Sequence, residues 1–409
     1  MMKHSLGLKK YISLLGAAAL VVPAGLNAQD NGVPEGLQPV LSSVSDLTIK
    51  GSFGAEFGAS AANRNRGNAP ADSFSTFNVS HLRLGVEATV YDDFHFDTVL
   101  SMLPSSFNPT INDLGGEGAG VNLYHATLTY TGFDVTDLTF GYAFPRFGRE
   151  AYADDEDLIT ITRSMLSTTL GPSQHTGLAA HGDWDIFDYH VGIYNSDAGG
   201  GENASGVYPV SYLFSLSGGV DLDEYARALH EDLTADLRVD YIYNDEAGGF
   251  GPGGGEPYKN AFAVSTEVGF MGVDVLYEYM WARANNTLGL PSRPKVHGYS
   301  ITPSYFVTDR FQAVVRYERM RNTEAPAIGA GTGGVAGGAF GHNAYAGNIA
   351  GIANFANKYQ AIYLGGNYYL HGENVKLMAG LELAEARDTV VNNFQSRTHT
   401  AMTALRMQF

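Results

Sequence analysis

The most constraining feature of this sequence is a regular series of short stretches with alternating apolar and polar residues. The connections between these stretches are alternately short and long. Within each stretch apolar and polar residues alternate with a period of two, which is typical of a β-strand wetted on one face only. Most stretches have roughly the 9–11 residues that a tilted strand needs to cross the hydrocarbon of a bilayer. We predict sixteen strands, at 47–58, 79–90, 94–102, 122–131, 137–146, 175–181, 187–195, 210–221, 233–244, 260–270, 273–283, 297–307, 311–321, 359–370, 375–386 and 397–409.

The connections indicate which kind of sheet these strands form. The short ones lie at 91–93, 271–272, 308–310 and 371–374. The long ones, rich in glycine, asparagine or acidic residues, lie at 60–78, 103–121, 147–174, 245–259 and 322–358. Short turns on one side and long loops on the other are the pattern of a transmembrane barrel, whereas a soluble sandwich has no reason to alternate in this way. The predicted fold is therefore all-β: a transmembrane antiparallel β-barrel.

A proline in one of the predicted strands bears on the strand number. Pro303 lies inside the strand predicted at 297–307, where it cannot donate to a hydrogen-bonded ladder. Strand numbers from about 14 to about 18 therefore stay open. A barrel of about sixteen strands leaves an aqueous channel, whereas one of about eight fills its interior with side chains.

The two faces of the predicted strands differ in charge. In the strand at 233–244, Leu237 and Val239 share one face, and Arg238 and Asp240 share the other. A basic side chain facing lipid costs about 2–4 kcal/mol at the bilayer midplane, so the charged faces should line the lumen. Aromatic rings favour the membrane interface, and several lie at strand ends: Tyr241, Tyr243, Trp281, Phe311, Tyr368 and Phe409.

The first residues have the organisation of a secretory signal peptide. Lys3, Lys9 and Lys10 precede an apolar run at 11–23, which is too short to span a bilayer as a helix. Small residues follow, and we predict cleavage after Ala28. The predicted regions are a signal peptide at 1–28, a periplasmic N-terminal tether at 29–46 and the barrel at 47–409.

Composition excludes several other classes of protein. The formal net charge is −18, which argues against nucleic acid as a partner, because nucleic-acid binding depends on neutralising phosphates. The chain has no cysteine, which excludes disulfides and cysteine-based zinc or redox chemistry. The twelve histidines show no metal-binding spacing, and His125, His181 and His190 are interpreted as ordinary strand residues. A G-x-G-x-x-G match at 329–334 lacks the strand and helix of a dinucleotide site, so we expect no cofactor.

One long connection, at 147–174, is predicted to fold inward and narrow the channel. Its apolar residues, among them Leu158, Ile161 and Met165, need a dry place to pack, although an outward, solvated loop is the alternative. Folded inward, the loop would set opposed charges across the channel. The charged residues predicted to do so are Arg149, Arg163, Asp154, Asp155, Glu156 and Asp157.

The strands add their own cations to the predicted channel lining. The residues of lumenal parity are Arg83, Arg238, Arg316, Lys376 and Arg406. Guanidinium groups bind phosphate or carboxylate in a bidentate way. The acids Glu87, Asp236, Asp240, Glu318 and Glu382 share the same faces. Such pairs would filter solutes by size and dipole more than by sign, or would simply stiffen the wall.

Two stretches resemble the phosphate-selective porin O and P family. They are Gly141 to Glu150, with the sequence GYAFPRFGRE, and Leu158 to Ser164, with the sequence LITITRS. Residues 366–377 are similar to the family's penultimate hairpin. The resemblance implies a trimeric sixteen-stranded porin in which lumenal lysines and arginines select small anions. The expected mature chain has only five lysines, too few for a lysine ladder.

The last strand also resembles the closing strand of outer-membrane barrels, in which a terminal aromatic residue such as Phe409 is read by the insertion machinery. Together these features predict an outer-membrane porin that lets small hydrophilic solutes or ions, including anions such as phosphate, diffuse passively. A homotrimer surrounded by outer-membrane lipid is the expected assembly. The alternative is an enzyme borne by a barrel, such as a lipase or protease, but no catalytic constellation stands out. A secreted glycine-rich adhesin would show short repeats, and none is found.

Overall fold

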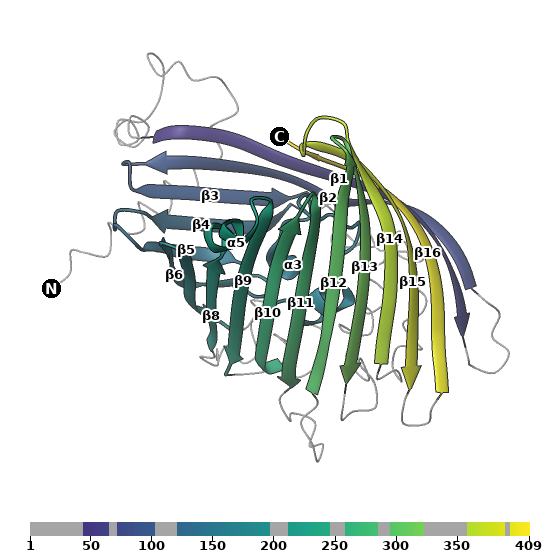
Figure 1. Ribbon diagram of the computed structural model, residues 1–409. Coiled ribbons are helices and arrows are strands. Elements are labelled where there is room, and N and C mark those ends of the chain that lie inside the picture. The colour runs from purple at the N-terminus through teal and green to yellow at the C-terminus, as the bar shows by residue number, and fades with distance from the viewer. Residues whose placement is uncertain are drawn as a thin grey trace.

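The computed structural model describes residues 44–64, 72–102, 121–196, 212–245, 258–284, 295–322, 358–388 and 393–409. In these ranges sixteen antiparallel strands form one closed barrel (Figure 1). Each strand pairs with its neighbours in sequence, and the ring closes where β1 pairs with β16. At that seam Gly51 and Phe409 exchange two backbone hydrogen bonds, of 2.9 and 3.0 Å.

The strands that form the ring have the following bounds. They are β1 (Val44–Arg64), β2 (Asp72–Val90), β3 (Phe94–Ser101), β4 (Asn122–Tyr130), β5 (Asp137–Ala143), β6 (His175–Trp184), β7 (Phe187–Asn195), β8 (Tyr212–Asp221), β9 (Leu233–Asn244), β10 (Tyr258–Phe270), β11 (Val273–Ala284), β12 (Lys295–Thr308), β13 (Phe311–Asn322), β14 (Lys358–Tyr369), β15 (Val375–Asp388) and β16 (Asn393–Gln408). The predicted fold and strand number are thus confirmed.

The largest differences from the predicted bounds occur at the first two strands. Residues 60–64 and 72–78 belong to β1 and β2, although they were predicted to form a loop. The small and polar residues there break the alternation, but the ladder continues because it is made by backbone groups. Pro303 is accommodated in β12 because the ladder to β13 omits residues 302 and 303.

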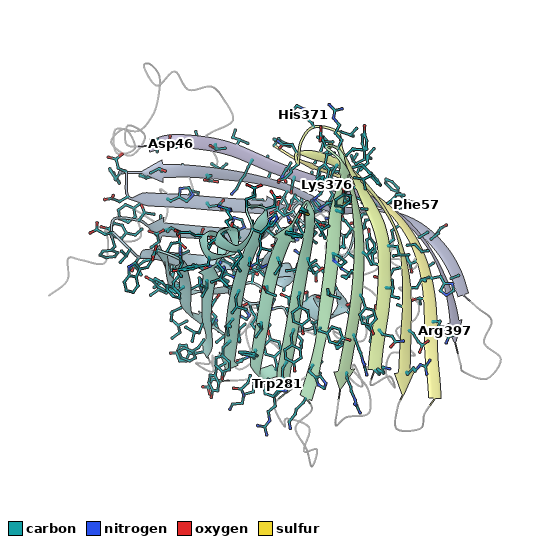
Figure 2. The ribbon with its side chains drawn as sticks, viewed as in Figure 1. Asp46, Phe57, Trp281, His371, Lys376 and Arg397 are labelled. Carbon is teal, nitrogen blue, oxygen red and sulfur yellow. The ribbon has the colours of Figure 1, made fainter. Side chains whose placement is uncertain are left out.

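Alternate side chains of each strand lie on opposite faces of the barrel. In β8, Leu213 and Ser215 are buried, whereas Phe214 and Leu216 are 43% and 54% exposed. Exposed apolar side chains of this kind are expected on a surface that faces lipid. The short turn that contains His371 lies at one end of the barrel. Trp281 and Arg397 lie toward the other end (Figure 2).

The connection between β5 and β6 crosses the interior of the ring. It spans residues 144–174 and contains two short helices, α3 (Arg149–Tyr152) and α4 (Met165–Leu170). We call it the inner connection. Its residues contact β2, β9, β11, β13, β14, β15 and β16 through hydrogen bonds. Only a segment inside a closed barrel can reach strands on so much of its circumference.

A third helix, α5 (Asp223–Leu229), lies in the connection between β8 and β9 and packs against β9. It was not predicted from the sequence. Arg227 forms an ion pair of 2.7 Å with Asp223 one turn earlier, which supports the helix locally. Among the described residues, no helix combines the length and apolar character needed to cross a membrane.

The predicted signal peptide, the predicted tether and part of the long connections lie outside the described residues. The predicted signal peptide at 1–28 and nearly all of the tether at 29–46 fall there. The same holds for most of 103–121, 245–259 and 322–358. The inner connection is the long connection that the structure describes throughout.

Candidate functional site

The inner connection packs its apolar side chains against one half of the barrel wall. Phe147, Met165, Leu166 and Leu170 are nearly inaccessible to solvent. They join a cluster that lies mainly on strands β9 to β15 and extends to Ala179, Tyr194 and Leu213 of β6 to β8. Its inward-facing residues on β9 to β15 include Ile242, Ala261, Met280, Met320, Ala361 and Ala384. Ile161 joins a second cluster on β13 to β16. The half of the wall formed by β9–β16 is therefore covered.

Carboxylates of this covered wall hold the backbone N–H groups of the inner connection. Gly148 donates to Asp240 at 2.9 Å, and Arg149 donates to Glu278 at 2.5 Å. Met165, at the start of α4, donates to Glu318 at 2.6 Å. Gly148 has φ +69°, and a Cβ there would lie 2.3 Å from the end of Met280, so glycine suits this close approach.

Cations of the same wall hold the carbonyl groups. Lys376 donates to the carbonyl of Leu158 at 3.0 Å. Arg406 donates to the carbonyls of Leu158 and Ile161, at 3.2 and 2.5 Å. Both cationic residues are 3% exposed. They therefore anchor the inner connection and lie beneath it.

Arg316 is the centre of a buried charge cluster. Its guanidinium lies 3.0 Å from Glu150 of α3, 3.4 Å from Glu382 and 3.7 Å from Glu318. It also donates to the carbonyl of Thr162 at 2.6 Å. The side chain is 1% exposed, so it joins β13 and β15 to the inner connection without access to solvent. Removing one member of such a buried cluster costs about 3–5 kcal/mol.

A second charge cluster fixes the acidic part of the inner connection to β2. Asp155 accepts hydrogen bonds from both Arg83 and Arg163, and Arg83 also lies 3.4 Å from Glu156. The Arg83 guanidinium stacks over the ring of Tyr124, 3.7 Å from its centroid. Burial alone would raise the pKa of Asp155, but Arg163 and Arg83 hold it below the usual range.

The neighbouring acids of the inner connection behave differently. Asp154 and Asp157 are exposed, and among the described residues neither carboxylate forms an ion pair. Partial burial and the nearby charge of Glu156 raise the pKa of Asp154. Partial burial likewise raises the pKa of Asp157, against the opposing effect of Lys376. These two carboxylates provide the uncompensated charge of the inner connection.

Three further arginines lie nearer the open part of the lumen and are paired with carboxylates. Arg149 lies 2.5 Å from Asp236 and 2.9 Å from Glu267. Asp188 of β7 lies between two guanidinium groups. It is 2.9 Å from Arg238 and 3.2 Å from Arg146.

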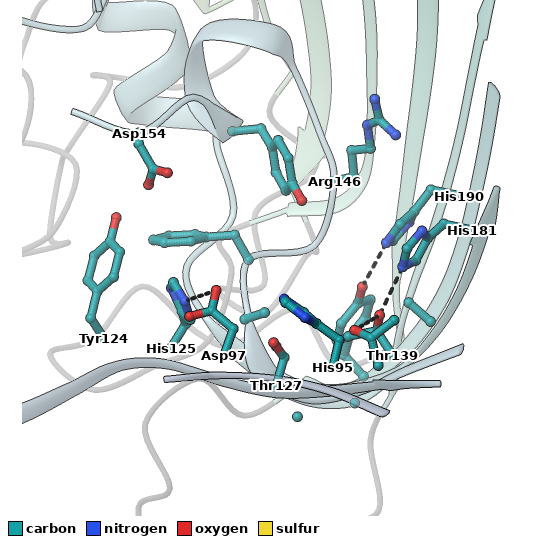
Figure 3. A pocket seen from close by; sticks show the side chains of 18 residues that line it. His95, Asp97, Tyr124, His125, Thr127, Thr139, Arg146, Asp154, His181 and His190 are labelled. Carbon is teal, nitrogen blue, oxygen red and sulfur yellow. Dashed lines mark hydrogen bonds and ion pairs between the residues drawn. The ribbon is translucent and has the colours of Figure 1, made fainter. Parts of the chain in front are cut away.

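The part of the wall formed by β3–β7 lines a cavity of about 370 Å³, although Ala179 of β6 and Tyr194 of β7 also belong to the buried cluster. Figure 3 shows Asp154 and Tyr124 at one end of it and Arg146, His181 and His190 at the other. The inner connection forms the opposite side with Phe144, Arg146, Tyr152 and Asp154. The space left inside the barrel therefore lies to one side of the barrel axis, next to β3–β7.

The strand side of this cavity carries a hydrogen-bonded series of hydroxyl and imidazole groups. Thr129 and Thr139 share a hydrogen bond of 2.8 Å, and Thr139 bonds to Nε2 of His181 at 2.8 Å. His181 stacks on His190, with ring centroids 6.0 Å apart. His125 bonds to Asp97 at 2.8 Å, and Asp97 in turn pairs with Lys50.

A smaller cavity of about 140 Å³ continues the passage toward the seam between β1 and β16. It shares Tyr124, His125 and Asp154 with the larger cavity. Lys50 and Arg83 line it as well, together with Gln408 and Phe409. The two cavities therefore adjoin at the three residues that they share, and together they border β1–β7.

The structure divides the predicted site residues into two groups. Arg316, Lys376 and Arg406 lie beneath the inner connection, and Glu156 is buried within it. Arg83, Arg149, Arg163 and Arg238, with Asp154, Asp155 and Asp157, lie at the surface of the lumen. Their effect on selectivity stays a prediction.

Of the groups that line the larger cavity, sequence reasoning singled out Asp154 but missed several others. These are four histidines, His95, His125, His181 and His190, with Arg146 and Tyr152. A signal was present, because histidines recur on the polar parity of successive strands. The sequence could not indicate that this half of the wall stays uncovered.

Comparison with known proteins agrees with this architecture. The model of the family phosphate-selective porin O and P matches residues 48–242. No curated protein matches the chain. The fold is similar to that of an anion-selective porin from Comamonas acidovorans, with a TM-score of 0.55 and 13% identity over 90% of this chain and 100% of that chain.

Two further structures share the fold. OmpT, an outer membrane protein of Vibrio cholerae, has a TM-score of 0.53 and 13% identity over 89% of this chain and 97% of that chain. OprB of Pseudomonas putida has a TM-score of 0.52 and 12% identity over 88% of this chain and 94% of that chain. The family match confirms the predicted resemblance. With its sixteen-stranded barrel, the chain is an outer-membrane porin for passive diffusion of small hydrophilic solutes, and its residues 48–242 match the phosphate-selective porin O and P family.

Proposed function

We propose that solutes cross this porin between the inner connection and the uncovered wall, and that the passage selects mainly by size and local field. The observation that carries the proposal is the eccentric position of the inner connection. It covers the inner faces of β9–β16, whereas β3–β7 line the larger cavity. A solute that follows this route meets Arg146 and Asp154 on one side and the histidines on the other.

The pairing of charges supports weak selectivity for cations. The arginines at the lumen surface each pair with a carboxylate, as Arg146 and Arg238 do with Asp188. An anion such as phosphate would have to displace that carboxylate to bind. Asp154 and Asp157 carry the uncompensated charge, so the field in the passage is negative. Under a KCl gradient we expect a cation-selective zero-current potential, and an anion-selective sign would contradict the proposal.

Single cysteines test the route, because the chain contains no cysteine of its own. Thr127 lines the larger cavity, whereas Thr302 is a buried residue of β12 that lines neither cavity. In a planar bilayer, a charged thiol reagent should lower the conductance of Thr127→Cys strongly and leave Thr302→Cys unchanged. The reverse pattern would place the passage on the other side of the barrel.

We also propose the features of biogenesis that the porin family suggests. These are export by a signal peptide, insertion by the outer-membrane machinery and assembly as a homotrimer. We further propose that the assembled porin transports ions and has no enzymatic activity. The barrel fold and the family match support this proposal. Gel mobility before and after boiling checks the assembly, because a folded trimer would migrate differently from the unfolded chain.

A further inference from the structure

We propose that the larger cavity is a binding subsite for neutral, polyhydroxylated solutes of the sugar type. The inference rests on the proposed passage along β3–β7 and adds a class of solute to it. Its first basis is the charge balance of the cavity. Of the charged lining residues, Arg146 is paired with Asp188, and Asp97 is paired with Lys50. Asp154 alone among the described lining residues keeps an unpaired charge, so the wall offers little to hold an ion.

The second basis is the type of hydrogen-bonding group on the wall. In the series Thr129, Thr139 and His181, each group can act as donor or acceptor, depending on rotamer or tautomer. A hydroxyl of a solute has the same dual character. The series can therefore reverse its polarity to match either role of an incoming hydroxyl, whereas a fixed cation or anion could not.

The third basis is the aromatic surface that faces this series. Phe144 and Tyr152 contribute rings from the inner connection, and Phe144 meets Tyr124 of β4 edge to face, with centroids 5.7 Å apart. Aromatic faces carry partial negative charge and attract the weakly positive C–H groups of a saturated ring. A sugar presents such C–H faces together with hydroxyls at its edge. The cavity thus offers aromatic rings on one side and hydroxyl-matching groups on the other.

The size of the cavity agrees with this class of solute. Its volume of about 370 Å³ is near the lower end of the roughly 300–1,000 Å³ typical of small-molecule sites. It adjoins the smaller cavity at Tyr124, His125 and Asp154, on the passage proposed above. Weak, reversible binding in a passage raises the local solute concentration without blocking release.

The test is the effect of D-glucose on the KCl current of the full-length porin in a planar bilayer. Glucose should reduce the current in a saturable way, whereas triethylene glycol, a flexible neutral solute, should produce only a linear decrease. Thr139→Val removes one hydroxyl at nearly constant volume. It should raise the half-saturating glucose concentration about fivefold, the loss expected for one hydrogen bond. Tyr152→Leu should weaken the effect from the opposite side.

Thr234→Val on β9 is the matched control, because Thr234 does not line the cavity, and it should leave glucose block unchanged. Equal linear decreases with both solutes would overturn the subsite, as would saturable block by inorganic phosphate but not by glucose. An equal shift in Thr139→Val and Thr234→Val would also overturn it. The cysteine experiment judges the passage independently: if Thr127→Cys is blocked by the thiol reagent and glucose has no saturable effect, only the subsite fails.

Discussion

The two halves of the lumen wall place polar side chains at similar inward positions but use them differently. On β9–β16, charged residues such as Asp240, Glu278 and Arg406 bond to the backbone of the inner connection. On β3–β7, Thr139 and His181 bond to each other and border open space. An inward-facing charge therefore need not act on a solute. It can instead bond to the backbone N–H and C=O groups of a buried loop, which have no water to bond to.

The covered half should be the more sensitive to mutation. Arg316→Met removes the cation that compensates Glu150, Glu318 and Glu382. We expect destabilisation of about 3–5 kcal/mol and a larger conductance, because the inner connection loses its central anchor. Thermal unfolding in detergent and single-channel conductance would measure both effects. Arg319→Met, on the same strand but outside this cluster, should change neither the stability nor the conductance. Unchanged stability in Arg316→Met would contradict the proposed difference between the covered and the open part of the wall.

A change on the open half should alter selectivity more than stability. Asp188→Asn releases Arg146 and Arg238 from their shared carboxylate. We expect the zero-current potential under a KCl gradient to shift toward anions, while thermal stability falls only by about 1 kcal/mol. Asp183→Asn, an exposed residue of the same hairpin, provides the control. The role assigned to Asp188 would be excluded by a selectivity identical to that of the control.

The smallest predicted effect concerns acidification. Because their pKa values are raised, Asp154 and Asp157 bind protons at a higher pH than ordinary aspartates. On acidification the passage therefore loses negative charge at a higher pH than it would with ordinary aspartates, and the preference for cations should decline. Asp154→Asn should weaken that preference already at pH 7 and reduce its further change on acidification. A pH profile of the zero-current potential would show this, and a parallel profile in the variant would argue against Asp154 as the source.

Much of the fold could be predicted because transmembrane strands leave a local signal. The alternation of Leu237 and Val239 with Arg238 and Asp240 is visible within β9 alone. The position of the inner connection is not local. Nothing in the sequence near Lys376 or Arg406 tells which loop they contact, since their partners lie more than 200 positions away. Parity could identify lumenal residues, but only the folded connection separates those that it buries from those that it leaves accessible.

The same long-range contacts constrain the order in which the molecule can assemble. Lys376 and Arg406 belong to β15 and β16, and β16 closes the ring against β1. The inner connection therefore gains its last anchors only when the final strands arrive. A segment of this size could not easily be threaded into a ring that is already shut. We infer that it is enclosed as the seam forms, so that barrel closure and the shaping of the passage are a single folding event.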